Sequence, residues 1–325
     1  MLKESHTTKT NNYLYILSKQ DIKLSLFELS KLVKQTKTDD NNKNNSLKFS
    51  QIDNIVFFKE NIDVNKTAYT KKGYRVLLEC KPSELKKKLL DLDIECNDTY
   101  KYEGKLEIAD IIWNKLNKNN SAKVDLKNPK NIFETIKISD ELVCFCILES
   151  ENKTDFESRK AHMRPHNHPT SLHPKLARAM INLSKSEEIL DPFCGTGGLL
   201  LEAGILGKKI TGYDLSNEMI IKAKDNLQAY GIYDFELLHK DALTLNQFFQ
   251  AIVTDVPYGR NSKVNALDLT INKFIELAYE HSKTLVIALP DFVEPKLGKW
   301  IIEEEFDYYL HKNLTKKIYV LRKNS

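Results

Sequence analysis

The sequence predicts an α/β fold for its second half, an open and mostly parallel sheet with helices on both faces, preceded by a smaller α+β region. Three observations lead to this prediction. From residue 187 onwards, short apolar segments alternate with amphipathic helical segments. Four of those apolar segments end in an aspartate. The first half mixes short strands with helices and holds the whole excess of basic residues.

Composition sets the broad class of protein. The 325 residues suffice for two or three domains, and 41% hydrophobic with 29% charged residues is typical of a folded protein with buried cores. Because no apolar run reaches the ~20 residues that cross a bilayer and the first twelve residues are polar, we expect no membrane association, no signal peptide and a cytoplasmic protein. Five scattered cysteines without a CxxC pair argue against a disulfide framework or a cysteine-rich zinc site.

The first half reads as short strands interspersed with helices. Alternating apolar residues predict strands at 13–18, 55–60, 74–80, 132–139 and 141–149, and helical spacing predicts helices at 25–35, 83–94 and 105–117. Cys144 and Cys146 lie two apart in the last strand, so we expect both thiols on one buried face. The polar residues 150–158 read as a linker.

The second half alternates regularly. Strands are predicted at 187–191, 208–214, 235–241, 249–255 and 284–290, and helices at 176–184, 198–207, 217–231 and 269–282. The segments 306–312 and 317–323 follow without a helix between them, and a short turn joins them. They therefore predict a β-hairpin at the end of the sheet.

Four aspartates close predicted strands of this half: Asp191, Asp214, Asp241 and Asp255. Ligands of open α/β sheets bind beyond the carboxyl ends of the strands. A single aspartate there is often only a helix cap. The four together with a glycine-rich turn indicate a ligand site.

The turn after the first strand reads DPFCGTGG, and its glycines remove Cβ atoms where a backbone must approach a ligand. The spacing is not the dinucleotide fingerprint GxGxxG. The opening Asp191 would repel a pyrophosphate but would accept hydrogen bonds from an ammonium group, which favours S-adenosylmethionine. The cofactor-binding residues predicted in this turn are Asp191, Pro192, Phe193, Cys194, Gly195, Thr196 and Gly197.

The next two aspartates complete a nucleoside pocket. Asp214, followed by Leu215, is placed to accept hydrogen bonds from two ribose hydroxyls. Asp241, followed by Ala242, is placed to accept the adenine amino group.

The fourth strand ends in TDVPYG, where we expect the chemistry. An exocyclic amine on a base is a poor nucleophile, and a carboxylate that accepts one of its N–H bonds stabilises the charge that develops during attack. Asp255 supplies that carboxylate, and Val256 supplies a backbone carbonyl beside it. Pro257 stiffens the turn, and Tyr258 offers a ring face to a base that has left its stack.

DPFCGTGG followed by TDVPYG resembles class I amino-methyltransferases with an Asp/Asn-Pro-Pro-Phe/Tyr motif, although Val256 replaces the first proline. Residues 159–184 (RKAHMRPHNHPTSLHPKLARAMINLS) resemble the segment that introduces the catalytic domain of the tRNA guanosine-10 N2-methyltransferase family of archaea and eukaryotes. Residues 123–138 resemble the end of a THUMP domain, an RNA-binding module.

The resemblance implies a Rossmann-like class I methyltransferase domain with a mixed seven-stranded sheet, behind an α+β ferredoxin-like and THUMP region. The implied division is 1–60 ferredoxin-like, 61–150 THUMP, 151–175 linker and 176–325 catalytic. It also implies transfer of one or two methyl groups from S-adenosylmethionine to the guanine amine at position 10 of tRNA. Some members of the family need a small zinc-binding activator protein as a partner.

Basic residues suggest where RNA binds. Residues 114–137 carry six lysines against two acids, so Lys115, Lys118, Lys123, Lys127 and Lys130 are candidates for phosphate contacts. The segment 159–178 has five Lys/Arg, four histidines and no acid. Arg164 in this segment is a candidate to bind an RNA phosphate or the carboxylate of the cofactor. We expect the histidines to line the cofactor mouth and to bind no metal, since no cysteine accompanies them.

Two alternatives stay open on the sequence. The same chemistry also suits another structured RNA, another tRNA position or DNA adenine, although the separate basic region favours structured RNA. A non-catalytic RNA-binding subunit is the other alternative, and the complete set of four aspartates argues against it.

Overall fold

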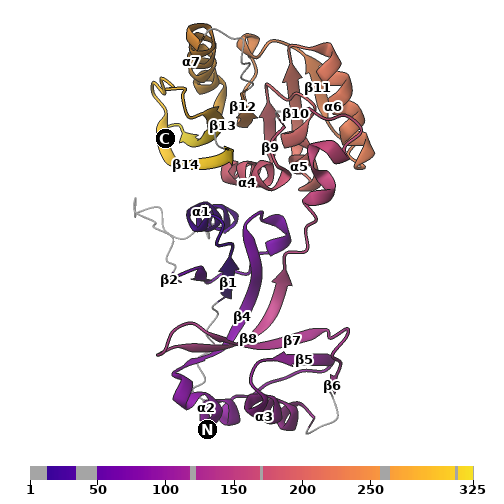
Figure 1. Cartoon of the computed structure of the whole chain (residues 1–325), viewed down its shortest axis with the longest axis vertical. Helices are drawn as coiled ribbons and strands as arrows, with labels where there is room; N and C mark the ends of the chain where they lie inside the picture. The colour runs from indigo at the N-terminus through magenta and orange to yellow at the C-terminus, as the bar shows by residue number, and fades with distance from the viewer. Residues whose placement is uncertain are drawn as a thin grey trace, which may run out of the picture. The chain divides into compact units, whose positions relative to one another are not determined.

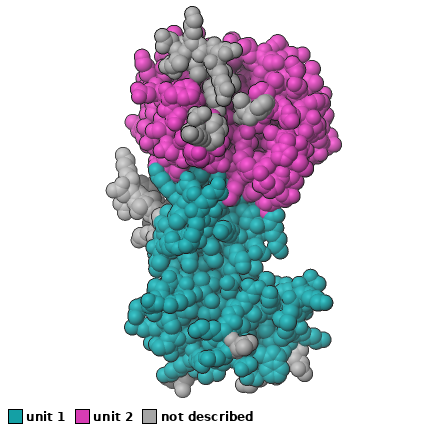
Figure 2. All heavy atoms as spheres, in the orientation of Figure 1, with its two compact units in different colours: residues 1–153 teal, residues 154–325 magenta. Residues whose placement is uncertain are grey.

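The structure is a computed structural model that describes residues 13–33, 50–117, 122–168, 171–256, 264–311 and 314–324. The chain forms two compact units, Met1–Lys153 and Thr154–Ser325, which are coloured separately in Figure 2. Each unit is built on a sheet of its own (Figure 1). In the described segments, every helix is too short or too polar to span a bilayer.

The first unit contains one eight-stranded sheet with the strand order β2-β3-β1-β4-β8-β7-β5-β6. Its strands are β1 (Tyr13–Leu17), β2 (Ser50–Ile52), β3 (Ile55–Phe58), β4 (Thr70–Cys80), β5 (Thr99–Glu103), β6 (Lys123–Val124), β7 (Asn131–Lys137) and β8 (Val143–Glu151). The long strands β4 and β8 pair antiparallel along most of their length. They join the part of the sheet around β1 to the part around β7.

Separate apolar cores stabilise the two parts of this sheet. Helix α1 (Ile22–Leu32) packs its apolar residues against β1 and β3. Helices α2 (Leu85–Asp91) and α3 (Leu106–Leu116) share a core with β5, β7 and β8 that includes a stacked pair of rings, Phe133 and Phe145. Cys144 and Cys146 are fully buried in one apolar cluster, as predicted for neighbours two apart on a strand.

The second unit contains a mixed seven-stranded sheet with the order β11-β10-β9-β12-β13-β15-β14. Its strands are β9 (Glu188–Asp191), β10 (Lys209–Asp214), β11 (Glu236–His239), β12 (Phe249–Asp255), β13 (Ser282–Pro290), β14 (Ile301–His311) and β15 (Leu314–Arg322). The first five strands in that order are parallel, and β15 pairs antiparallel with both β13 and β14. The predicted parallel sheet and terminal hairpin are therefore confirmed.

Helices cover both faces of this sheet. Helix α7 (Val264–His281) packs on a core that takes alternate residues of β13, including Leu285, Ile287 and Leu289. The residues between them point to the other face. That face carries α4 (Pro174–Ser184), which contacts β12 and β13, and beside it α5 (Gly198–Ile205) and α6 (Asn217–Ala229). This is the doubly wound arrangement that the alternating sequence predicted.

Candidate active site

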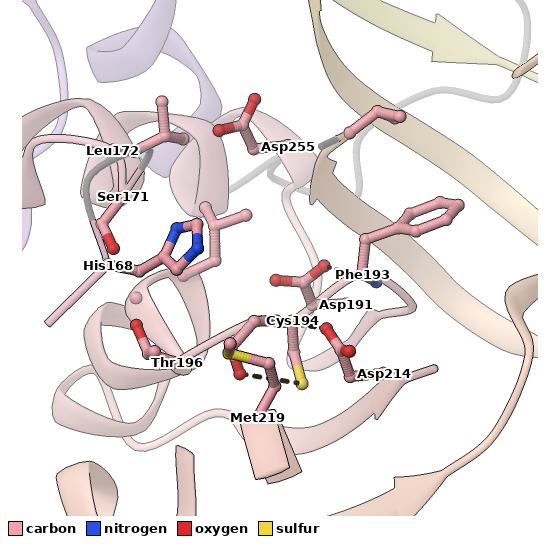
Figure 3. A pocket seen from close by; sticks show the side chains of 14 residues that line it. His168, Ser171, Leu172, Asp191, Phe193, Cys194, Thr196, Asp214, Met219 and Asp255 are labelled. Carbon is pink, nitrogen blue, oxygen red and sulfur yellow. Dashed lines mark hydrogen bonds between the residues drawn. The ribbon is translucent and has the colours of Figure 1, made fainter. Parts of the chain in front are cut away.

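The order of the strands marks one place where a ligand can bind. The chain runs from β9 to β10 to β11 in one direction along the sheet, then returns to β12 on the other side of β9. At such a reversal the connections diverge and leave a crevice at the carboxyl ends of the strands. Asp214, Asp191 and Asp255 end the adjacent strands β10, β9 and β12, so their carboxylates form a row across this crevice (Figure 3).

A cavity of about 230 Å³ occupies the crevice. It is lined by eight residues predicted to bind cofactor or act in catalysis: Asp191, Phe193, Cys194, Gly195, Thr196, Asp214, Asp255 and Val256. The structure thus brings the turn after β9 and the ends of three strands into one pocket (Figure 3).

The turn after β9 has the tight backbone that its glycines suggested. Gly195 and Gly197 adopt φ angles of +51° and +80°, where other residues are strained. The Gly195 N–H donates to Asp214 Oδ2 over 2.9 Å, and the Ser216 N–H donates to Asp214 Oδ1 over 2.8 Å. Asp214 therefore ties the turn to the neighbouring strand, and each of its oxygens still has a lone pair for a ligand hydroxyl.

Asp191 is the most buried carboxylate of the row. Thr254 Oγ1 and the Phe193 N–H donate to its Oδ1 over 2.7 and 3.2 Å. Burial raises its pKa to about 7, and the negative charges of Asp255 and Asp214 add to that rise. In the described part of the chain no donor reaches Oδ2, which is therefore available to a cationic group.

Asp255 is held by a residue that the sequence reasoning missed. Lys316, from β15, forms an ion pair with Asp255 Oδ1. Burial raises the Asp255 pKa, and the charge and hydrogen bond of Lys316 oppose that rise. No local signal identified Lys316, because it is 61 positions from Asp255 in the sequence. The two residues meet only because β13 pairs with both β12 and β15.

Other predicted site residues lie away from the cavity. Strand β11 ends at His239, and Asp241 instead caps a short 3-10 helix, where its carboxylate accepts the Leu243 N–H over 2.9 Å. Asp241, Ala242, Leu215, Pro192 and Gly197 are not among the residues that line the pocket. The prediction that Asp241 closes a strand was wrong by two residues. Pro257 and Tyr258 lie outside the described residues.

The segment before α4 supplies further lining residues. His168, Ser171 and Leu172 border the cavity, whereas the other three histidines expected at its mouth are not among its lining residues: His162, His166 and His173. Met219, in the first turn of α6, also lines it and was not predicted (Figure 3). Asn226 of α6 fixes this segment to the glycine turn, because its amide donates to His166 O and to Thr196 O over 2.8 and 2.9 Å.

Buried arginines surround the start of α5. Arg159 and Arg178 both pair with Glu202, which is fully buried, at 2.7 and 2.8 Å. Arg164 is only 5% exposed, and its Nε donates to Arg159 O over 2.8 Å. Its position inside the second unit does not fit the expected contact with RNA phosphates.

The Arg164 guanidinium lies against the glycine turn instead. Its Nη1 is 2.9 Å from the place where a Cβ of Gly198 would stand, and Gly198 lines the cavity. Both Nη atoms are buried and have no hydrogen-bond partner within the described segments. A buried guanidinium with unmet donors at a helix N-terminus points to an anionic ligand group there.

The predicted RNA-contacting lysines are mostly at the surface of the first unit. Lys123, Lys127 and Lys130 are exposed, and Lys130 pairs with Asp98 at 2.7 Å. Lys115 is half-buried, and its ammonium group donates a hydrogen bond to Leu92 O over 2.8 Å. This group is therefore only partly available to an RNA phosphate. Lys118 lies outside the described residues. Across those residues, no cluster of three or more potential metal ligands occurs.

Known proteins with similar sequences include methyltransferases. Residues 161–288 match the family model "RMKL-like, methyltransferase domain". The chain is 35% identical over 214 residues to the tRNA (guanine(10)-N2)-dimethyltransferase of Methanothermobacter thermautotrophicus, and 34% identical over 233 residues to that of Methanocaldococcus jannaschii. These alignments cover 62% and 67% of this chain and 64% of each relative.

A shorter relative is covered almost completely. The "Probable tRNA (guanine(10)-N2)-dimethyltransferase" of Methanothermococcus thermolithotrophicus is 31% identical over 170 residues, which is 46% of this chain and 98% of that protein. The residues matched by the family model include the glycine turn and the strands that carry the three carboxylates. On this evidence the chain belongs to the tRNA (guanine(10)-N2)-dimethyltransferase family.

Proposed function

We propose that the protein transfers methyl groups from S-adenosylmethionine to the exocyclic N2 amine of guanosine at position 10 of tRNA. The names of its archaeal relatives support the reaction and the substrate. The observation that carries the proposal is the row of Asp214, Asp191 and Asp255 along one cavity. Whether one or two methyl groups are added depends on the room beside the acceptor amine.

The polar groups in and beside the cavity fit S-adenosylmethionine. Asp191 Oδ2 suits its ammonium group, and Asp214 suits the ribose hydroxyls. The unmet Arg164 donors next to Gly198, together with the N-terminus of α5, suit its carboxylate. Phe193, Leu172 and Met219 give the cavity apolar walls for the base and the sulfur-linked carbons.

The residues of this chain then have to orient the acceptor. When bound, S-adenosylmethionine supplies an activated methyl group: a nitrogen–carbon bond forms, the carbon–sulfur electron pair stays on sulfur, and a proton leaves the nitrogen. Asp255 accepts an N–H of the amine, which aligns the nitrogen lone pair and stabilises its developing positive charge. Val256 is buried beside it, and its carbonyl serves as a second acceptor. We assign the base-stacking role to Tyr258 and the stiffening of the turn to Pro257.

We also propose that the first unit binds the tRNA. Its exposed Lys123, Lys127 and Lys130 follow α3, whose Trp113 is 55% exposed and offers a ring to RNA. The division into a ferredoxin-like part (1–60), a THUMP domain (61–150), a linker (151–175) and a catalytic domain (176–325) belongs to this proposal. A cytoplasmic location and a small zinc-binding activator protein as a partner are also part of this proposal.

Methyl transfer to defined transcripts tests the proposal. The protein is incubated with tritium-labelled S-adenosylmethionine and unmodified tRNA, and the product nucleosides are separated. We expect N2-methylated guanosine, no incorporation when guanosine-10 is replaced by adenosine, and at least a ~10³-fold slower reaction for Asp255→Ala. Incorporation that survives replacement of guanosine-10 would redirect the proposal to another tRNA position. Methylation of DNA adenine alone, or an active Asp255→Ala, would overturn it.

A further inference from the structure

Lys316 is one of the most buried charged residues of the second unit. Its side chain is 2% exposed, and it lies on β15 between the buried residues Leu314 and Ile318, which share its face of the sheet. Moving an ammonium group out of water costs several kcal/mol unless an opposite charge compensates. The position of this lysine therefore requires a reason, and the Asp255 carboxylate provides one.

The pairing is set by the topology of the sheet. Asp255 is opposite Ala288 of β13, and Ala288 is opposite Ile318 of β15, so Lys316 reaches across β13 to the end of β12. The hydrogen bond ends on Asp255 Oδ1. No described residue donates to Oδ2, and Asp255 lines the cavity.

The chemistry of an amine acceptor demands a particular state of Asp255. Only the ionised carboxylate offers two acceptor oxygens, one for Lys316 and one for the amine, because a protonated carboxyl group presents an O–H donor in place of one acceptor. Burial favours protonation of Asp255, and the charge of Asp255 in turn favours protonation of the neighbouring Asp191. The charge and hydrogen bond of Lys316 on β15 oppose this effect of burial and favour the ionised form of Asp255.

We propose that Lys316 is a positioning residue that holds Asp255 ionised through Oδ1 and leaves Oδ2 to the acceptor amine. This inference rests on the proposed function, because that function supplies the acceptor amine. The ion pair itself is independent of it. Lys316 does not contact the reacting atoms, and its effect passes through Asp255.

Two variants separate this role from a merely structural one. Lys316→Met keeps the length of the side chain and removes its charge, whereas Lys316→Arg keeps the charge. For Lys316→Met we expect the acidic limb of the single-turnover pH profile to move up by at least ~1 pH unit. At pH values below this limb, the rate of Lys316→Met is roughly tenfold lower than that of the parent. At pH 9 the variant reaches the rate of the parent. Lys316→Arg retains a profile close to that of the parent.

A second readout does not need activity. Without Lys316, the folded-state pKa of Asp255 lies further above its unfolded value, so stability present at low pH is lost as pH rises through the folded pKa. We expect the unfolding midpoint of cofactor-free Lys316→Met to fall more steeply between pH 5 and 8 than that of the parent. In Lys316→Met/Asp255→Asn this extra slope disappears.

The outcomes are distinguishable. An equal loss of rate at every pH, with no extra slope in the unfolding midpoint, would mean that Lys316 contacts the substrate and would overturn the inference. So would an unchanged pH profile and midpoint. If the parent protein methylates no tRNA, the proposed function fails, while the unfolding slopes still decide whether Lys316 keeps Asp255 ionised.

Discussion

Asp191 shows how burial turns a common carboxylate into a pH-sensitive one. Its pKa of about 7 results first from burial, against which the hydrogen bonds from Thr254 and Phe193 N–H act. In the protein without ligand, Asp191 therefore exchanges its proton near neutral pH. A cationic ligand group at Oδ2 binds the ionised form.

We predict that the affinity for S-adenosylmethionine rises roughly fivefold to tenfold between pH 6 and 7.5, as Asp191 ionises while the ligand amine stays largely protonated. Calorimetric titrations at several pH values measure this change. Asp191→Asn serves as the control, with weaker binding and little pH dependence. Equal affinity of the parent at pH 6 and 7.5 would contradict the assignment.

Arg164 permits a test that distinguishes two parts of one ligand. Because its guanidinium is proposed to face the carboxylate, we predict that Arg164→Met weakens binding of S-adenosylhomocysteine about tenfold or more. Binding of 5′-methylthioadenosine, which lacks the amino-acid tail, stays within about twofold. Calorimetry with both ligands provides the measurement, and equal weakening of the two would show a general loss of structure.

Sequence reasoning located the residues whose position follows from local geometry. Asp191, Asp214 and Asp255 each end a strand, and parallel strands bring their ends to one edge. It failed for Asp241, because two extra residues after β11 turn its carboxylate into a helix cap. Arg164 was assigned to RNA because a sequence does not show whether a basic residue is exposed.

At the scale of elements, close packing explains one of the glycines. A Cβ on Gly212 of β10 would stand 2.5 Å from Leu200 Cδ1 of α5 and 2.8 Å from Leu237 Cδ2 of β11. Helix α5 therefore approaches the sheet closely at this glycine. That contact places the glycine turn over the ends of β9 and β10.

We predict that Gly212→Ala lowers the free energy of unfolding of the second unit by about 1–3 kcal/mol, because the added methyl group displaces Leu200 and Leu237. Denaturant unfolding followed by tryptophan fluorescence measures the loss. Glu236→Ala, at an exposed position of the neighbouring strand β11, is the control and changes stability by less than about 0.5 kcal/mol. A Gly212→Ala variant as stable as the parent would contradict this prediction, because it would show that α5 can move away from the sheet without loss of stability.

The alternating pattern predicted the elements of the second unit well, because apolar periodicity is a local property. Each predicted strand and helix from residue 176 onwards has a counterpart in the structure. The order of the last three strands was not predictable in this way. Strand β15 lies between β13 and β14, and which edge a hairpin joins depends on packing between distant segments.

At the scale of the whole molecule, the chain consists of two units with separate sheets. The predicted α+β character of the first half is confirmed, but its strands form one continuous sheet through β4 and β8. Sequence patterns located most of these strands but did not predict that they form one sheet. The pairing of β4 with β8 joins residues about seventy positions apart, and a local pattern does not show such a pairing.

We predict that a protein of residues 154–325 binds S-adenosylmethionine within about threefold of the full chain, because all the described residues that line the cavity lie in the second unit. Its affinity for tRNA falls at least tenfold, since the lysines of the first unit are absent. Calorimetry and filter binding at two salt concentrations measure both. Unchanged tRNA affinity of the shorter protein would place RNA binding in the second unit.

The position of β15 also has a consequence for synthesis on the ribosome. Asp255 is translated 61 residues before Lys316, so the buried carboxylate emerges long before its counterion. A nonsense mutation between codons 291 and 313 would spare all the described residues that line the cavity. It would still deprive β13 of its antiparallel neighbour and leave Asp255 without a cation, so such truncations should be as inactive as losses of the whole gene.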